Sequence, residues 1–196
     1  MSSITHICNL ALQRIGKPAI QDVNDLQNSS ARYCKNFWDH CRDEVLQGAD
    51  WGFANQLVAL AEVGTAPPGW QFSYQQPTNC LKAREIVRAN PQSKPIPFQR
   101  IASDDGNSVR IVTNQQAAWL SFTARILNPV VYPTTFQEAL AWRLAAELAW
   151  PLAKDKKRAN ECQQFYQTAL SAASTVDANQ AVAQESALPD SILARE

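Results

Sequence analysis

The side chains best suited to chemistry in this chain of 196 residues are two histidines and five cysteines. Nucleophilic catalysis needs a serine or cysteine beside a histidine and an orienting acid. His40 and Cys41 are adjacent on a predicted helix, so their side chains point in different directions. We interpret His40 as a surface or partly packed residue, and we expect neither a catalytic residue nor an enzyme.

The cysteines do not have the spacing of a metal site. They include no CxxC pair, and structural zinc sites need closely spaced Cys and His pairs. We expect them to be small buried hydrophobes in a reducing compartment. They are Cys8, Cys34, Cys41, Cys80 and Cys162.

Paired carboxylates are the remaining candidates for metal binding. Asp39 and Asp43 lie four residues apart on a predicted helix, and a solvated acidic face explains them better than a metal does. Asp104 and Asp105 fit a turn better than a ligand set. The phosphate-loop patterns GxxxxGK[ST] and GxGxxG are both missing. We therefore expect no metal and no cofactor.

The formal net charge is zero, which argues against a general nucleic-acid-binding protein. The charges are unevenly distributed, because residues 82–125 carry seven Lys and Arg against three Asp and Glu. Residues 1–62 carry five against seven, and residues 134–196 carry six against eight. The basic middle could contact a phosphate backbone, although a solvated sheet face explains it as well. Arg84, Arg88, Arg100, Arg110 and Arg125 would line a DNA channel if several of them share one face.

The opening segment lacks a basic n-region and an uninterrupted apolar core, so it does not resemble a signal peptide. No apolar run approaches the roughly 20 residues that span a bilayer. We expect the protein to be made in cytoplasm and to have no membrane partner.

Apolar periodicity predicts four amphipathic helices. Ser2 or Ser3 would cap the first helix, and one of residues 28–30 would cap the second. Thr134 or Thr135 would cap the third, with Glu138 completing a capping box from Thr135. The predicted helices cover residues 3–15, 29–47, 135–150 and 156–176.

Residues 51–127 have the alternation of short strands, although residues 51–63 are ambiguous between strand and helix. Residues 104–107, with the sequence DDGN, predict a hairpin turn. We expect an aromatic core to form around this region. Its members would be Trp51, Phe53, Trp70, Phe72 and Tyr74.

The predicted fold class is α+β, mostly α, with a helical bundle from both chain ends around a small antiparallel β-region. Residues 1–176 would form this domain. Residues 177–196 are rich in Ala, Gln and Ser and would be a flexible tail.

The order of these pieces resembles the phage head-to-tail adaptor (connector) family, which includes the podophage tail tubular protein A. The resemblance covers roughly residues 4–175. It is carried by LQRIG and WGFA near the second helix, by Tyr74, Pro77 and Cys80-Leu81, and by Tyr132-Pro133 before the Ala/Leu-rich helix.

The resemblance implies a structural virion protein of the neck with a role in genome ejection. Such proteins form a ring, usually of about twelve copies, between the portal protein and the next tail or nozzle protein. Genomic DNA passes transiently through that ring. In this family the C-terminal segment often docks onto the portal, and here Leu188, Ile192 and Leu193 would be its apolar anchors.

Three alternatives stay open on the sequence. One is a head-closure or tail-completion protein, which would also form a ring but would not contact the portal. A cytoplasmic DNA-binding module is less favoured. A small hydrolase or nuclease is disfavoured by the two histidines and the missing motifs.

Overall fold

The computed structural model describes residues 3–88, 93–103 and 105–185, without the side chains of residues 174–185. The chain divides into two compact units. We call them the helical unit, formed by Met1–Phe53 with Leu127–Glu196, and the β-unit, formed by Ala54–Ile126. The mixed α and β content, dominated by helices, agrees with the predicted class.

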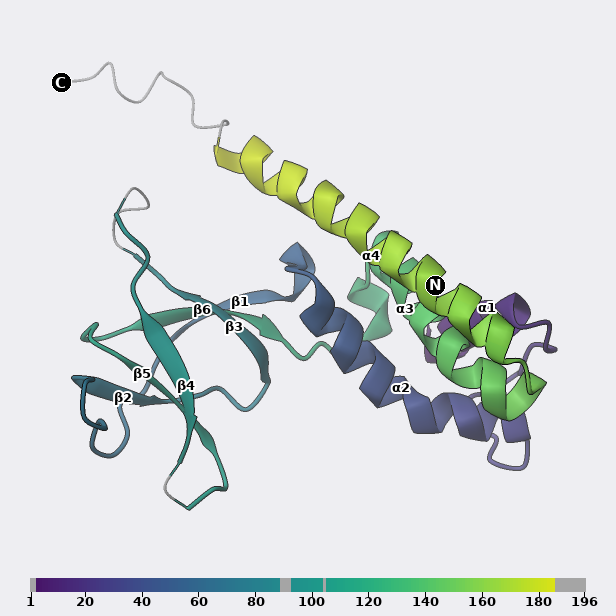
Figure 1. Cartoon of the computed structure of the whole chain (residues 1–196), viewed down its shortest axis with the longest axis horizontal. Coiled ribbons are helices and arrows are strands. Elements are labelled where there is room, and N and C mark those ends of the chain that lie inside the picture. Colours follow the sequence, from purple (N-terminus) through teal and green to yellow (C-terminus); the bar gives the residue numbers. More distant parts are fainter. Residues whose placement is uncertain (1–2, 89–92, 104, 186–196) are drawn as a thin grey trace. The chain divides into compact units, whose positions relative to one another are not determined.

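Among the described residues the helical unit contains four α-helices, with short 3₁₀ and π elements next to three of them (Figure 1). The helices are α1 (Ile4–Arg14), α2 (Ser29–Gly48), α3 (Thr134–Leu148) and α4 (Lys156–Glu185). The turns are η1 (Gly52–Ala54), which crosses the unit boundary, η2 (Pro129–Val131) and the π-helical η3 (Ala149–Ala153).

The first two helices begin as the sequence predicts. The Ser3 hydroxyl accepts a hydrogen bond from the His6 N–H at 3.1 Å, and the Asn28 side chain accepts from the Ser30 N–H at 2.9 Å. At the end of α1, Gly16 has a φ of +68°, which places it in the left-handed region that a C′ glycine favours.

The predicted cap of α3 is wrong. Its N-cap is Pro133, and no side chain caps the helix. Because α3 begins at Thr134, both threonines lie inside its first turn. Glu138 instead forms an ion pair with Arg14 at 2.6 Å, which ties α3 to the end of α1.

The core of the helical unit lies on α3, which packs against α1, α2 and α4. The leucines supply bulk, and the alanines let neighbouring helices approach closely. The fully buried α3 side chains are Phe136, Ala139, Leu140, Ala141, Leu144, Ala145 and Leu148.

An aromatic cluster closes one end of this core. Phe136 packs edge-on against Trp51 at 5.0 Å, Phe53 at 5.1 Å and Tyr132 at 4.7 Å between ring centroids. The Trp51 indole N–H donates to the Val45 carbonyl at 2.8 Å, which holds the chain leaving α2 against that helix.

The expected single aromatic core is therefore wrong. Trp51 and Phe53 belong to the helical unit, whereas Phe72 and Tyr74 belong to the β-unit. The turn η1 explains the ambiguity of residues 51–63, because it separates Trp51 from the first strand.

The last helix is longer than predicted. After α3, Pro151 removes a backbone donor, and the chain makes the π turn η3 before Lys154 adopts a left-handed conformation with φ 56°. From Lys156, α4 continues to Glu185, so the helix runs past its predicted end at residue 176 and residues 177–185 are helical. Residues 186–196 lie outside the described part.

The β-unit consists of two antiparallel three-stranded sheets, ordered β1-β6-β3 and β2-β5-β4. Isolated bridges pair Glu62 with Tyr74 and Ile86 with Ile96, which joins the two sheets at both of their sides. The strands are β1 (Asn55–Ala59), β2 (Phe72–Gln75), β3 (Cys80–Ile86), β4 (Phe98–Ala102), β5 (Val109–Thr113) and β6 (Trp119–Ala124).

Both sheets contribute to one β-unit core. Its members include Tyr74 from β2, Ile86 from β3, Ile111 from β5 and Phe122 from β6, all buried. The predicted hairpin joins β4 and β5, and Gly106 in its turn has a φ of +69°.

Candidate interaction surfaces

The side chains that could do chemistry are either buried or widely separated. All five cysteines are free and buried. Burial raises the pKa of the Cys41 thiol to about 12. A hydrogen bond with Cys34, together with burial, raises the pKa of the Cys8 thiol. Such thiols are poor nucleophiles at neutral pH. Within the described ranges no three His, Cys, Asp or Glu side chains are placed to hold a metal ion.

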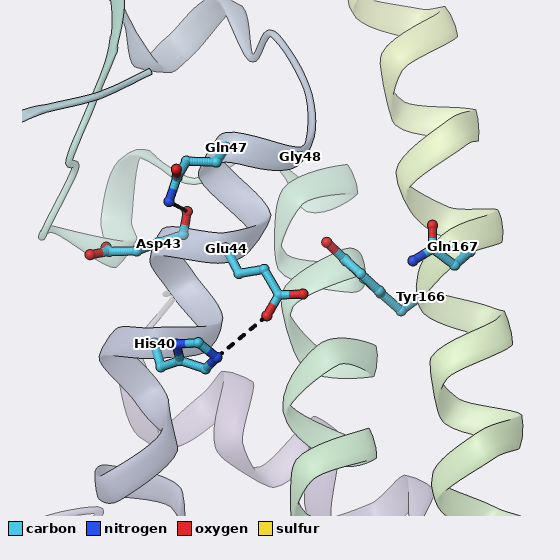
Figure 2. A pocket seen from close by; sticks show the side chains of 7 residues that line it. All are labelled: His40, Asp43, Glu44, Gln47, Gly48, Tyr166 and Gln167. Atoms are coloured by element: carbon cyan, nitrogen blue, oxygen red, sulfur yellow. Dashed lines mark hydrogen bonds and ion pairs between the residues drawn. The ribbon is translucent and has the colours of Figure 1, made fainter. Parts of the chain in front are cut away.

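A groove of about 440 Å³ lies between α2 and α4 of the helical unit. Figure 2 shows His40, Asp43, Glu44 and Gln47 on the α2 side, with the Tyr166 side chain extending from α4. Gly48 lets α4 pack closely against the end of α2, because an added Cβ would lie 3.0 Å from Leu170 Cδ2 and 3.3 Å from the Tyr166 hydroxyl. The groove is open. Its acidic side chains Asp43 and Glu44 are each bound to an arginine, and the Tyr166 ring is only 3% exposed.

The charged residues of the groove are held by a defined network. Arg143 on α3 donates to Glu44 at 2.8 Å and pairs with Glu147 at 2.6 Å. Burial disfavours the Arg143 cation, but the hydrogen bonds with Glu44 and Glu147 outweigh it and raise the Arg143 pKa. The His40 imidazole lies 3.6 Å from Glu44 and is largely exposed.

A second, nearly buried arginine supports the same stretch of α2. Arg42 makes a two-pronged contact with Asp43, at 2.9 Å from Nε and 2.7 Å from Nη2, and reaches Asp39 at 2.7 Å. The predicted acidic pair Asp39 and Asp43 is thus a clamp around Arg42.

One face of the β-unit carries large apolar side chains in solvent. Trp119 is 52% exposed, Leu57 60% and Val87 38%. Trp119 pairs with Ala59 in the sheet register, and the Val87 N–H donates to the Trp119 carbonyl at 2.8 Å. We call this group the Trp119 face and define it as Leu57, Ala59, Val87 and Trp119.

Sequence reasoning missed the Trp119 face, although a signal for it exists. Leu120, Phe122 and Ala124 alternate into the core, so Trp119 must point to the opposite side. A tryptophan on the outer side of a regular alternation indicates an exposed aromatic.

A second exposed tryptophan lies at the π turn. Trp150 is 49% exposed, with the Lys156 ammonium 4.9 Å and the Lys154 ammonium 5.8 Å from its ring centroid. Arg158, close to these lysines in the sequence, donates to the Arg14 carbonyl and pairs with Glu161 at 3.1 Å. The Arg158 charge therefore serves packing within the helical unit.

The five predicted channel arginines lie on several elements of the β-unit. Arg84 on β3 donates to the Thr123 hydroxyl at 2.9 Å, and Arg88 after β3 donates to the Ser93 carbonyl at 2.5 Å. Arg125 follows β6.

The remaining two arginines lie on paired strands but on different faces. Arg100 pairs with Ile111, and Ile101 pairs with Arg110. Directly paired side chains point the same way, so Arg100 and Arg110 lie on opposite faces of their sheet. These two cannot line a channel from one sheet face.

The predicted docking residues Leu188, Ile192 and Leu193 lie outside the described residues. The helix before them is described. At 1.5 Å per residue α4 is about 45 Å long and α3 about 22 Å, so α3 can cover only about half of α4. Ala173 is the last α4 side chain described as buried.

Among the described residues no helix is both long and apolar enough to cross a membrane. Comparison of the chain with protein-family models and with curated protein sequences finds no match.

Proposed function

We propose that this chain is a structural protein of a phage neck, which forms a ring that joins the portal protein to the tail. The order of helices and strands that resembles the head-to-tail adaptors supports the proposal. In this proposal, helices from both chain ends form a bundle around the β-unit, and bundles of neighbouring copies build the ring wall. The ring continues the DNA channel toward the next tail or nozzle protein.

The observation that carries the proposal is the length of α4. The helix extends past the last described buried side chain, Ala173, to Glu185. Because α3 is half as long as α4, it leaves about half of α4 without this partner, and isolated helical turns gain little stability from propensity alone. Its position directly before the apolar residues Leu188, Ile192 and Leu193 makes portal docking the role that we assign to this end.

The surface of the β-unit also suits a protein that assembles with others. The Trp119 face leaves large apolar and aromatic side chains in solvent. A structural role without catalysis is part of the proposal. Arg84, Arg88, Arg100, Arg110 and Arg125 remain the DNA-facing candidates of the proposal, with Arg100 and Arg110 on opposite faces of their sheet.

Portal binding by truncated chains tests the proposal. The portal protein of the same genome would be immobilised, and binding measured for the full chain, a chain ending at Val176 and a chain ending at Glu185. We expect at least about a tenfold loss of affinity for the shortest chain, because it lacks both the helix extension and the anchors. Leu188→Ser, Ile192→Ser and Leu193→Ser combined in the full chain should reproduce most of that loss.

Equal portal affinity for all four proteins would contradict the docking role. It would favour a head-closure or tail-completion protein. Circular dichroism of each variant serves as the folding control, since the α1 to α3 core is unchanged.

A further inference from the structure

Three of the seven lysines of the chain lie within four residues of sequence. Lys154 follows the π turn η3, and Lys156 and Lys157 are the first two residues of α4. All three are exposed. Together with the exposed tryptophan of η3 they form a surface that we call the Trp150 patch, defined as Trp150, Lys154, Lys156 and Lys157.

The positive charge of the Trp150 patch is not used inside the helical unit. Among the described residues none of its three lysines forms an ion pair. Asp155 lies between them in sequence, but its carboxylate accepts a hydrogen bond from the Arg158 N–H at 2.9 Å and so caps α4. The buried and half-buried arginines of the same unit, in contrast, all pair with acids. They are Arg14, Arg42, Arg143 and Arg158.

The turn itself brings the lysines to the tryptophan. The Lys154 N–H donates to the Trp150 carbonyl at 3.0 Å, and the left-handed Lys154 backbone, with φ 56°, redirects the chain into α4. The Lys154 and Lys156 ammonium groups therefore lie on either side of Asp155 in sequence but near the same indole in space.

The Trp150 indole gives the patch an aromatic centre. Trp150 is 49% exposed, although tryptophan gains more than most residues from burial. The Lys156 ammonium lies 4.9 Å and the Lys154 ammonium 5.8 Å from the ring centroid. These cation–π contacts keep two otherwise flexible charges close to one planar, solvent-accessible ring.

A nucleic-acid strand matches both properties of the patch. Its phosphates complement the lysines, and an unpaired base supplies a planar surface for the indole. An acidic peptide offers carboxylates without such a plane. A membrane surface needs several exposed apolar side chains, whereas Trp150 is the one large apolar side chain exposed among the described residues 149–160. Bases in a duplex stack on one another, so the contact with the indole is available only in a single strand.

We propose that the Trp150 patch binds single-stranded nucleic acid, with phosphates at its three lysines and one base stacked on the Trp150 indole. The inference goes beyond the proposed function, because it needs neither a ring nor a portal protein. It also concerns the helical unit, and not the arginines of the β-unit.

Fluorescence anisotropy of a labelled strand of about 20 thymidines, titrated with the purified full-length chain, tests the proposal. The chain has no net charge, so we expect weak binding, with a Kd of about 10–100 μM at about 0.05 M salt. The affinity should fall as salt is raised, because each phosphate contact releases counterions.

Removing the lysine charges should have the largest effect. The combined changes Lys154→Gln, Lys156→Gln and Lys157→Gln should weaken binding at least about tenfold. They should also reduce the slope of log affinity against log salt by about 2, because three phosphate contacts to a single strand are lost.

The matched control removes the same number of charges elsewhere. Lys17→Gln, Lys35→Gln and Lys94→Gln combined change the net charge equally and should weaken binding less than about threefold. Circular dichroism of both triple variants is the folding control.

The tryptophan variants test the stacking contact separately from charge. Trp150→Ala should weaken binding of the single strand about fivefold or more and change binding of a duplex of the same length less than about twofold. Trp150→Phe keeps an aromatic ring and should retain most of the affinity. Trp119→Ala is the control, since Trp119 in the β-unit is exposed to a similar degree.

Three results would overturn the inference: a wild-type chain that leaves the strand unbound at about 1 mM protein, equal losses in the two triple lysine variants, or a Trp150→Ala chain that binds like wild type. Binding to vesicles that contain phosphatidylglycerol, without binding to the strand, would also overturn it and indicate a membrane surface. Failure of the proposed function is a separate result, because it is read from portal binding. A chain that binds the portal but not the strand would keep the adaptor assignment and lose this inference.

Discussion

The helical unit and the β-unit use their polar and apolar groups in opposite ways. In the helical unit the arginines act internally, as Arg42 clamps Asp39 and Asp43 while Arg143 joins Glu44 to Glu147. In the β-unit the most distinctive side chain, Trp119, is half in solvent. The comparison indicates that charged side chains of the helical unit stabilise its own fold, whereas the β-unit exposes a large aromatic side chain to solvent.

The sharpest way to break this comparison is to create a cavity in each core. Phe136→Ala in the helical unit should lower the free energy of unfolding by about 3–5 kcal/mol, because a fully buried ring is lost from the aromatic cluster. Hydrogen exchange should show the loss of protection mainly in α2 and α3.

Phe122→Ala is the matched change in the β-unit, where Phe122 is equally buried. Its loss of protection should concentrate in β3 and β6. If either variant destabilised both units to the same extent, the separation of the two cores would be contradicted.

Removing an arginine that pairs within the helical unit should lower the free energy of unfolding by a smaller amount. Arg143→Ala should cost about 1–3 kcal/mol, because Glu44 and Glu147 lose a nearly buried partner while staying partly hydrated themselves. Urea unfolding measures the change, and Arg32→Ala at an exposed α2 position should change stability by less than about 0.5 kcal/mol. Equal costs at the two positions would count against the network.

The stability of the helical unit should fall at alkaline pH. Burial raises the pKa of Tyr132 and of Tyr166, both in the helical unit, to about 12. An unfolded tyrosine ionises near pH 10, whereas the two folded tyrosines stay protonated up to about pH 12. Their contribution to the free energy of unfolding is therefore fully present below about pH 10 and is lost as the pH rises toward 12. We expect a loss on the order of 1–2 kcal/mol for each tyrosine.

Urea unfolding at a series of alkaline pH values tests this expectation. Tyr132→Phe and Tyr166→Phe should flatten the pH dependence, since phenylalanine does not ionise. An unchanged slope in the double variant would assign the alkaline loss to other groups, such as the buried Cys41 thiol.

The smallest expected effect concerns a surface aromatic of the helical unit. Phe165 stacks on Trp142 at 4.7 Å between centroids, and the Arg14 guanidinium lies 3.9 Å from the Trp142 ring centroid. Phe165→Ala should cost about 0.5–1.5 kcal/mol, because the ring is half exposed. A cost as large as that of Phe136→Ala would mean that this surface belongs to the core.

Local signals in the sequence were enough to predict much of the fold. Ser3 and Asn28 mark helix starts by their own side-chain chemistry, and Gly106 marks a hairpin whose strands β4 and β5 are neighbours in sequence. Pairing of β1 with β6 joins Asn55 to Thr123 across the whole unit, and no local signal indicates it. The sequence predicts a threonine cap for α3, which is wrong because Pro133 occupies the N-cap without a side-chain hydrogen bond.

The candidate surfaces were less predictable because they form only in the folded chain. Tyr166 and Glu44 line one groove although more than a hundred residues separate them. Which arginines share a face also depends on the folded chain, since the strand register places Arg100 and Arg110 on opposite faces of their sheet. Only Trp119 could have been assigned to an outer face from alternation alone.

Cryo-electron microscopy of the chain mixed with the portal protein of the same genome tests the central claim most directly. The account predicts a ring on the portal, with the end of α4 and the residues after it inserted between portal subunits. A chain that stays monomeric and unbound in the same mixture would contradict the neck assignment and reopen the question of its activity.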